Sequence, residues 1–524
     1  MVKANRKATP SVHSDPLYLW KMFPSKDKAD QLLELYIKTL ENVYHVLHLP
    51  SFRKQYNDLW QQPERSHANS AFLCIVLLMM GCVMSIDAPP EMKFVGDDSV
   101  SRATAVAWIL ACDEWIRSHS QKYLTLEYFQ VRCLLIISKM IVGTHIKRWY
   151  VEVGELTRMA ISVGLYLEVE GSKIGKVMSK FDKEMRRRLW AVISELELLV
   201  CMLRGLPSIL PGIDTTCTPP QDIHDEELHP MNMPLISDTV SASQLKPIEY
   251  LVFACRSREL RLKLLAKLNN PSDECEAPEL IRFEDEITTA LKRTNDMKTG
   301  STMCATTESL PRIQLRMWLF RLMLLLNRHV STTSTSESTR RYAVHRCMEI
   351  ATTMIKEHQE VDQGTRLLLT YFHAPIFTAA MSLCLDLTSG SPHHLSDSQE
   401  TCNLIEYALN TMETRALRLG GVYRRYWLLL AAFATLRMRL NPGKAKEIDE
   451  RAAEKLTSIL YKIISHQVSS ADAVPQHAQP APLPPLDQST SLFDQPIVDT
   501  DFGLADFDFE SLSNLSWDVF MAND

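Results

Sequence analysis

Glycine is scarce in this chain, with 16 of 524 residues, about 3% against a usual ~7%. Rossmann and P-loop architectures depend on glycine-rich turns, so the scarcity argues against both and favours helices. Apolar residues make up 46% of the chain, which is enough for a sizeable core. The length allows two or three domains, or one large helical domain.

Apolar residues recur at spacings of three and four along most of the chain, and strand-like alternation is nearly absent. We therefore predict an all-α fold, with one large multi-helix domain over residues 20–466. The predicted helices cover residues 30–46, 70–86, 103–115, 124–141, 149–165, 183–203, 248–268, 278–297, 315–329, 341–358, 364–387, 399–419, 423–440 and 444–466.

The most apolar stretch is residues 71–86, which contain no charged residue. A membrane-spanning helix needs about 20 such residues. We therefore predict a buried core helix, with Ser70 as its N-cap, and no membrane association. Residues 1–16 are polar and lack the apolar region of a signal peptide, so we expect a soluble, intracellular protein.

Four segments lack helical periodicity. Residues 1–19 form a short basic and polar N-terminus, and residues 207–247 hold seven prolines and are predicted to be a long loop. The Ser- and Thr-rich residues 331–339 also indicate a loop. Residues 467–490 are rich in proline and predict a disordered linker that cannot pack a core.

The last segment, residues 491–524, is acidic and aromatic. The final 62 residues contain ten Asp and Glu and no Lys or Arg. Acids alternating with bulky apolar residues are typical of a disordered activation segment, which can bind the groove of a coactivator through a short helix. The alternatives are an ordinary disordered terminus or a last helix docked on the body. The residues predicted to contact the transcription machinery are Phe502, Leu504, Phe507, Phe509, Leu512, Leu515, Trp517 and Phe520.

The charge of the body gives little indication of nucleic-acid binding. The chain has a net charge of −6, and without the ten tail acids 57 Lys and Arg face 53 Asp and Glu. Proteins that bind nucleic acids usually carry a clustered basic face. At the N-terminus, Lys3, Arg6 and Lys7 would supply only weak, salt-sensitive and sequence-independent contacts.

The twelve cysteines do not have the spacing of a zinc site. The two closest are eight residues apart, whereas structural zinc sites use closely spaced pairs. Most lie in apolar runs, so we interpret them as small buried side chains in a reducing compartment. We predict no cofactor.

The search for catalytic and metal sites is negative. His224 and His229 are five residues apart and lack the spacing of a helical metal pair. Residues 284–286 are three adjacent acids that point in different directions on a helix, so we interpret them as a solvated face. His45 and His48 are interpreted as packing residues. We predict no catalytic or metal-binding residue, and therefore no enzyme.

Three segments carry a resemblance to a known family: residues 43–52, 150–166 and 184–209. Together they resemble the fungal-specific transcription factor domain, the middle homology region of fungal zinc-cluster regulators. The resemblance covers about residues 30–260 well and extends over the helical remainder. The third segment is the most specific, since an Arg-Arg-x-Leu-Trp helix is followed by a Gly-x-Pro turn. The residues that match this structural motif are Arg187, Trp190, Arg204, Gly205 and Pro207.

The third segment can also be interpreted from its residues alone. Apolar residues from Leu189 to Val200 repeat at three and four and predict one buried helix face. Residues 186–188 are three arginines that could pair with acids or cap a neighbouring helix. Gly205 permits a left-handed helix end, and Pro207 prevents the helix from resuming. Glu195 and Glu197 stand near the position where the family often has an aspartate.

The resemblance implies a nuclear transcription regulator, an activator that controls a metabolic or secondary-metabolite gene cluster. It also implies a homo- or heterodimer partner. Such regulators usually begin with a six-cysteine module that holds two zinc ions and binds DNA. No cysteine precedes Cys74 here, so we expect either an upstream start or a regulator that reaches DNA through a partner. The alternatives are a helical scaffold or corepressor without DNA binding of its own, and an α-helical enzyme.

Overall fold

The computed structural model describes most of the helical region. The described residues are 16–61, 69–86, 92–119, 124–168, 178–221, 223–228, 249–270, 275–297, 310–362, 373–389, 398–421 and 423–469. The predictions for the first fifteen residues, for nearly all of the proline-rich linker and for the acidic tail lie outside them. The domain boundaries proposed above therefore stay predictions.

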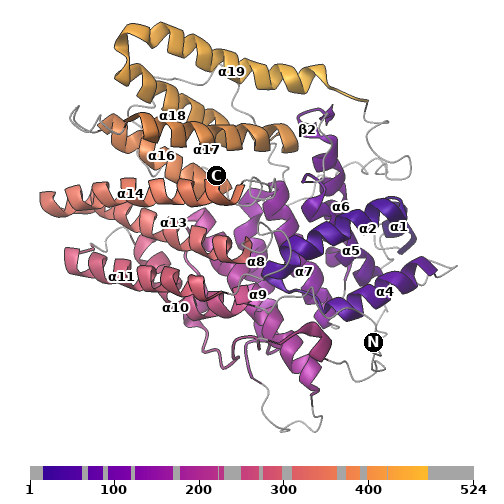
Figure 1. Ribbon diagram of the computed structural model, residues 1–524. Helices are drawn as coiled ribbons and strands as arrows, with labels where there is room; N and C mark the ends of the chain where they lie inside the picture. The colour runs from indigo at the N-terminus through magenta and orange to yellow at the C-terminus, as the bar shows by residue number, and fades with distance from the viewer. Residues whose placement is uncertain are drawn as a thin grey trace, which may run out of the picture.

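The described residues form an all-α fold, which confirms the predicted class (Figure 1). The only strands among them are β1 (Phe94–Val95) and β2 (Asp98–Ser99), which pair antiparallel. The helices are α1 (Pro16–Lys21), α2 (Lys26–Tyr36), α3 (Asn42–Tyr44), α4 (Leu49–Gln61), α5 (Ser70–Val83), α6 (Val100–Ser118), α7 (Leu126–Val142), α8 (Trp149–Ser162), α9 (Lys180–Arg204), α10 (Glu249–Leu268), α11 (Ala277–Arg293), α13 (Leu310–Thr333), α14 (Glu337–Asp362), α16 (His373–Ser389), α17 (Ser398–Leu419), α18 (Arg424–Leu440) and α19 (Ala445–Ser465).

The C-terminal helices stack upon one another in Figure 1, from α10 and α11 through α13, α14 and α16 to α18 and α19. The N-terminal helices α1, α2, α4, α5 and α6 lie to the right of this stack. Between the two groups, α9 packs against α7, α8 and α10. The molecule is therefore organised around central helices that are covered on several sides.

Helix α5 is one of these covered helices, as its uncharged sequence predicts. Every residue from Ala71 to Val83 is buried. The N-cap is Asn69 and not Ser70, because the Asn69 side chain accepts a hydrogen bond of 3.0 Å from the Ala71 N–H. In the described part of the chain, no helix combines the length and the apolar character that crossing a bilayer requires.

The loop predicted at residues 331–339 is wrong over most of its length. Helix α13 continues to Thr333 and α14 begins at Glu337, which leaves three residues between them. The hydroxyls of Thr332 and Thr333 both donate to the carbonyl oxygen of His329 at 2.8 Å. Because these hydroxyls bond within the preceding turn, they are compatible with a helix.

Helices α1 and α4 and a π-helical turn at Ile37–Glu41 were not predicted. In α4 the buried residues Leu49, Phe52, Tyr56 and Leu59 do follow helical spacing. The predicted loop at 207–247 holds only two short 3₁₀ turns in its described parts, Leu210–Gly212 and Asp225–Glu227.

A small hairpin, formed by β1 and β2, contacts the C-terminal end of the described chain. The N–H of Phe94 in β1 donates to His466 at 3.0 Å, and the N–H of Val468 donates to Phe94 at 2.9 Å. On the other strand, Asp98 pairs with Gly420, directly after α17. Residues about 370 positions apart in the sequence are thereby held side by side.

Gly420 is the tightest point of this connection, and its replacement by alanine should destabilise the fold. Its φ of 67° is left-handed, and an added Cβ would overlap the backbone of Asp97 and lie 2.7 Å from the Ser99 nitrogen. We expect a loss of at least about 2 kcal/mol in thermal or denaturant unfolding. The control is Gly443→Ala, where the added Cβ meets nothing within 4 Å; equal losses in both variants would contradict this account.

Candidate functional site

Helix α9 carries the motif that resembles the family and lies at the centre of the domain. Every residue from Arg188 to Met202 is buried. The prediction of a single buried face was therefore too narrow, since the helix is covered all round. Its buried polar side chains must find partners inside the protein, because a buried polar group without one is costly.

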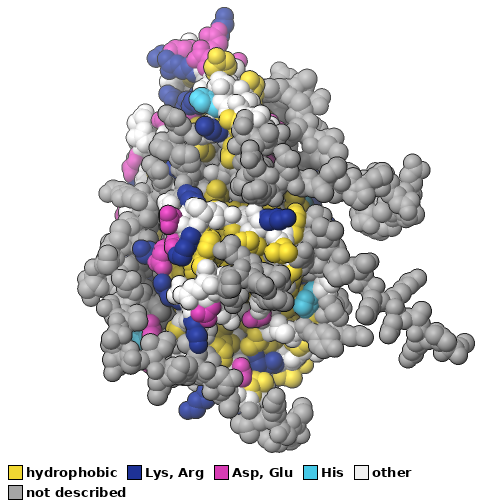
Figure 2. All heavy atoms as spheres, turned by 90° about the vertical axis from the view of Figure 1, so that its right-hand side faces the viewer, with side chains coloured by type: hydrophobic (Ala, Val, Ile, Leu, Met, Phe, Trp, Pro, Cys, Tyr) yellow, Lys and Arg dark blue, Asp and Glu magenta, His cyan; other side chains and the backbone are white. Residues whose placement is uncertain are grey.

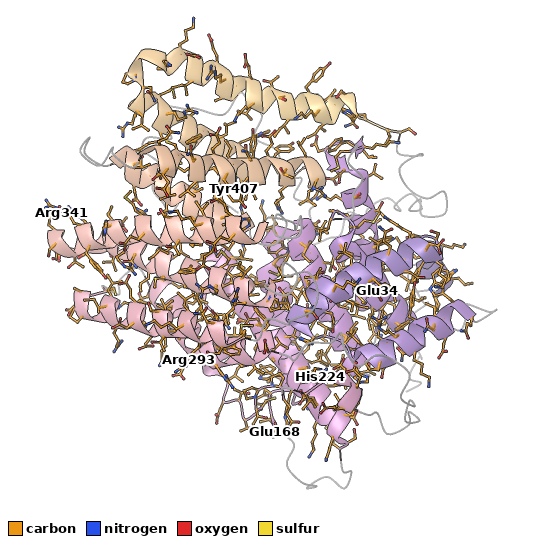
Figure 3. The ribbon with its side chains drawn as sticks, in the orientation of Figure 1. Glu34, Glu168, His224, Arg293, Arg341 and Tyr407 are labelled. Carbon is orange, nitrogen blue, oxygen red and sulfur yellow. The ribbon has the colours of Figure 1, made fainter. Side chains whose placement is uncertain are left out.

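The first two arginines of the triplet fix the segment that follows α8. Arg186 donates to the carbonyl oxygens of Gly164 and Val163, at 2.7 and 3.3 Å, and so caps the end of α8. Arg187 pairs with Glu168, with Nε to Oε2 at 3.0 Å. Figure 3 shows Glu168 near the lower end of α9. The prediction that these arginines pair with acids or cap a helix is confirmed.

Arg188 is fully buried and joins α9 to the long loop. Its Nη1 lies 2.5 Å from Oδ1 of Asp225, and its Nε lies 3.4 Å from Oε1 of Glu184. Burial alone would raise the pKa of Asp225, but the Arg188 charge and the hydrogen bond from Leu49 hold it below its usual range. The carboxylate is therefore ionised in the folded protein at neutral pH.

Asp225 also holds the start of α4. Its Oδ2 accepts from the Leu49 N–H at 2.8 Å, and its carbonyl oxygen accepts from Nε2 of His48 at 2.9 Å. Nδ1 of His48 then accepts from the Ser51 hydroxyl at 2.7 Å. A single acid thus connects α9, the 3₁₀ turn and α4, and His48 has the packing role that was predicted.

Next to this network lie two buried groups that are neutral at neutral pH. Burial raises the pKa of Glu41 to about 8, although the Leu47 N–H donates to its Oε1 at 2.7 Å. Burial and the nearby Arg188 charge lower the pKa of His45 to about 4. His45 also has a left-handed φ of 44°, which is uncommon for a residue with a Cβ.

The end of α9 forms the predicted turn. Gly205 has a φ of 60° and its N–H donates to the Cys201 carbonyl oxygen. Glu197 then binds the chain beyond the turn: it accepts from the Ser208 hydroxyl at 2.6 Å and from the Ile209 N–H at 3.0 Å. Glu197 therefore has the local role that the sequence left open.

The other motif residues surround this turn. Trp190 donates from Nε1 to the Thr215 hydroxyl at 3.1 Å. The Pro207 carbonyl oxygen accepts from the Tyr150 hydroxyl at 2.8 Å. Arg204 lies in the last turn of α9, where a positive charge is favourable to the helix dipole. These contacts stabilise the junction of α8, α9 and the loop, and none of them involves a reactive group.

A second buried ion pair joins α9 to α10. Arg261 donates to both carboxylate oxygens of Glu195, at 2.8 and 2.7 Å, and both residues are at most 1% exposed. The Tyr250 hydroxyl donates to the same carboxylate at 2.8 Å. Burial would raise the pKa of Glu195, but Arg261 and Tyr250 lower it below its usual range.

The sequence could have indicated the two buried acids of α9 but not their partners. Glu195 and Glu197 interrupt an otherwise apolar stretch, which suggests that each needs a partner. Asp225 and Arg261 lie in ordinary polar contexts and gave no such signal. The interpretation of residues 284–286 as a solvated face is wrong for Glu284, which accepts hydrogen bonds from Asn327 and Tyr342 in the interior.

The remaining predicted residues do not form a reactive centre. The activation segment, from Phe502 to Phe520, lies outside the described residues. Within the described ranges, no group of three or more His, Cys, Asp or Glu could hold a metal ion. Most of the described cysteines are buried, as predicted.

Comparison with known proteins defines the class. The fungal specific transcription factor domain matches residues 33–250. This range contains α9, its turn and both buried charge networks apart from Arg261. Residues 33–250 are therefore a domain of this family, which confirms the resemblance found in the sequence. The family is described as a transcription factor domain, and relatives of the chain are named as transcription factors, not as enzymes, in agreement with the prediction.

Three relatives illustrate the similarity. The chain is 26% identical to transcription factor opdR of Penicillium oxalicum, over 47% of this chain and 30% of the relative. It is 23% identical to transcription factor lepE of Aspergillus flavus, over 65% and 40%. It is 22% identical to the pyrrolocin cluster transcription factor fsdR of a fungal species, over 53% and 36%. The matched region thus spans less than half the length of each of these three relatives.

Breaking the pair between Glu195 and Arg261 should destabilise the domain strongly. Glu195→Met leaves a buried guanidinium without its carboxylate, and we expect a loss of about 3–5 kcal/mol in denaturant unfolding. The double variant Glu195→Met, Arg261→Met removes both charges and should recover most of that loss. Additive losses in the double variant would show that the two residues act independently.

Glu41 should make stability depend on pH. Its folded pKa lies above its ordinary value, so its stabilising contribution is complete below about pH 4.5 and is lost as the pH rises toward 8. Glu41→Gln stays neutral throughout. Between pH 5 and 8 the wild type should lose up to about 1.4 kcal/mol per pH unit relative to this variant.

The control for this experiment is Glu34→Gln, because Glu34 is an exposed partner of Arg53. Its stability should follow the wild type at every pH. Parallel unfolding curves for the wild type and Glu41→Gln across this range would mean that Glu41 ionises normally in the folded protein.

Proposed function

We propose that the chain is a nuclear transcription regulator, an activator of a metabolic or secondary-metabolite gene cluster. The observation that carries the proposal is the match of residues 33–250 to the fungal specific transcription factor domain. One relative, the pyrrolocin cluster transcription factor fsdR, is named for a cluster. In this proposal the helical domain is the regulatory module, which binds a homo- or heterodimer partner.

The activating part is the acidic-aromatic segment, residues 491–524. Its composition supports this role, since acids keep the segment solvated while apolar side chains stay available to a coactivator. A regulatory task for the helical body is supported by its described residues, in which most buried arginines are paired with other protein groups and no group of three or more His, Cys, Asp or Glu could hold a metal ion.

DNA is reached either directly or through a partner. Figure 2 shows one face of the molecule, on which the described Lys and Arg side chains are scattered among hydrophobic and acidic ones. This distribution differs from the clustered basic surface of a DNA-binding protein. A zinc cluster or a DNA-binding partner is therefore the proposed source of sequence specificity.

Replacing the apolar residues of the tail should abolish activation without unfolding the body. Fused to an unrelated DNA-binding domain, residues 467–524, which comprise the linker and the acidic-aromatic segment, should activate a reporter. A variant with alanine at all eight predicted contact residues should reduce reporter expression to the level of the DNA-binding domain alone. These residues are Phe502, Leu504, Phe507, Phe509, Leu512, Leu515, Trp517 and Phe520. The thermal unfolding of the full chain should not change, because the described helical core is formed without any of these residues.

The matched control replaces two apolar residues of the linker, Leu483 and Leu486, by alanine, and it should leave activation intact. A silent wild-type fusion would favour the second candidate, a helical scaffold or corepressor that binds proteins only. Full activation by the alanine variant would mean that the acids alone are sufficient.

A further inference from the structure

All but one of the buried arginines in the described part of the chain are paired with an acid or a carbonyl oxygen. Six described arginine side chains are less than a tenth exposed, and five of them bind an acid or a carbonyl oxygen. The five pairs are Arg132 with Glu155, Arg188 with Asp225, Arg261 with Glu195, Arg328 with Asp386, and Arg321 with the Met202 carbonyl. The exception is Arg415.

Arg415 lies one turn before the end of α17 and is only 5% exposed. Its Nε is completely buried and has no hydrogen-bond partner. In the described part of the chain, its guanidinium forms no hydrogen bond and no ion pair. An unpaired charge in a protein interior strongly destabilises the fold, so such a group requires an explanation.

Neighbouring positive charges make the buried charge of Arg415 still less favourable. Burial, and then repulsion by Arg425 and Arg102, lower its pKa to about 9, so it remains a cation at neutral pH. No described acid acts on it. Asp98, which pairs with Gly420 directly after α17, is bound to Arg102.

Arg102 and Arg425 are each held by contacts with other parts of the protein. Arg102 donates from Nε to the Val142 carbonyl oxygen at 3.0 Å and from Nη2 to the Gly143 carbonyl oxygen at 3.2 Å. Arg425 is the second residue of α18 and lies over the Phe377 ring. The start of α18 adds the positive end of its helix dipole. Arg102 and Arg425 are thus near enough to Arg415 to repel it, in the region where α17 meets α18 and the hairpin.

We propose that Arg415 is the centre of a binding site for a small anion that carries a carboxylate or phosphate group. A guanidinium binds such groups through paired hydrogen bonds, which would satisfy the nitrogen atoms that have no partner. The burial of Arg415 favours a small molecule over a peptide or a nucleic acid, since neither could reach a side chain that is 95% covered. The inference is independent of the activation proposed for the tail.

The test measures binding to the purified full-length chain and needs no transcription assay. Inorganic phosphate and malonate are titrated separately at constant ionic strength, by calorimetry and by thermal unfolding. We expect the wild type to bind one of them and its Tm to rise by about 2 °C or more at saturation. Arg415→Met should bind roughly tenfold or more weakly and, without the anion, should be at least as stable as the wild type.

The matched control is Arg53→Met, which removes an exposed arginine far from the cluster and should bind like the wild type. If Arg415→Met fails to fold, Arg425→Gln takes its place and should weaken binding several-fold. Absent binding in the wild type, or equal binding by Arg415→Met, would overturn the proposal. Binding of a peptide of residues 501–521, without binding of either small anion, would overturn it in favour of docking by the tail.

Discussion

The domain depends on the burial of α9, whose residues from Arg188 to Met202 are all buried and which packs against α7, α8 and α10. A helix in this position can carry polar groups only if each has a partner. Arg188, Glu195 and Glu197 satisfy that condition through Asp225, Arg261 and the turn after Gly205. The same contacts fix where α4, α10 and the long loop lie.

Such buried pairs are better suited to specifying an arrangement than to increasing stability. Two charges leave water at a cost that their attraction only partly offsets, whereas an apolar pair of similar volume would pack without that cost. The contacts of Glu195 and Asp225 are directional, so they select one orientation of α10 and one path of the loop. A domain with a single defined arrangement presents the same surface to every molecule that binds it.

The spacing of apolar residues predicted most of the helices, but the sequence predicted few of the buried ion pairs. The predicted helix ends were close to the observed ones wherever a strong apolar stripe ended at a helix-stopping residue, as at Gly205. They failed at Ser331–Thr339, where hydroxyl groups bond within the helix, and at α4, whose stripe is short. Asp225 and Arg261 could not be identified, because their partners are 37 and 66 residues away and no local pattern reports such a distance.

The hairpin at residues 94–99 has a consequence for how the protein is made. Its partners at Gly420 and His466 leave the ribosome on the order of tens of seconds after it, at ~5–20 residues per second. During that interval Phe94, which is 1% exposed in the finished fold, lacks its backbone partners His466 and Val468. The N-terminal helices must therefore remain soluble while incomplete, and a nascent chain of this kind is a natural client for chaperones that shield apolar surface.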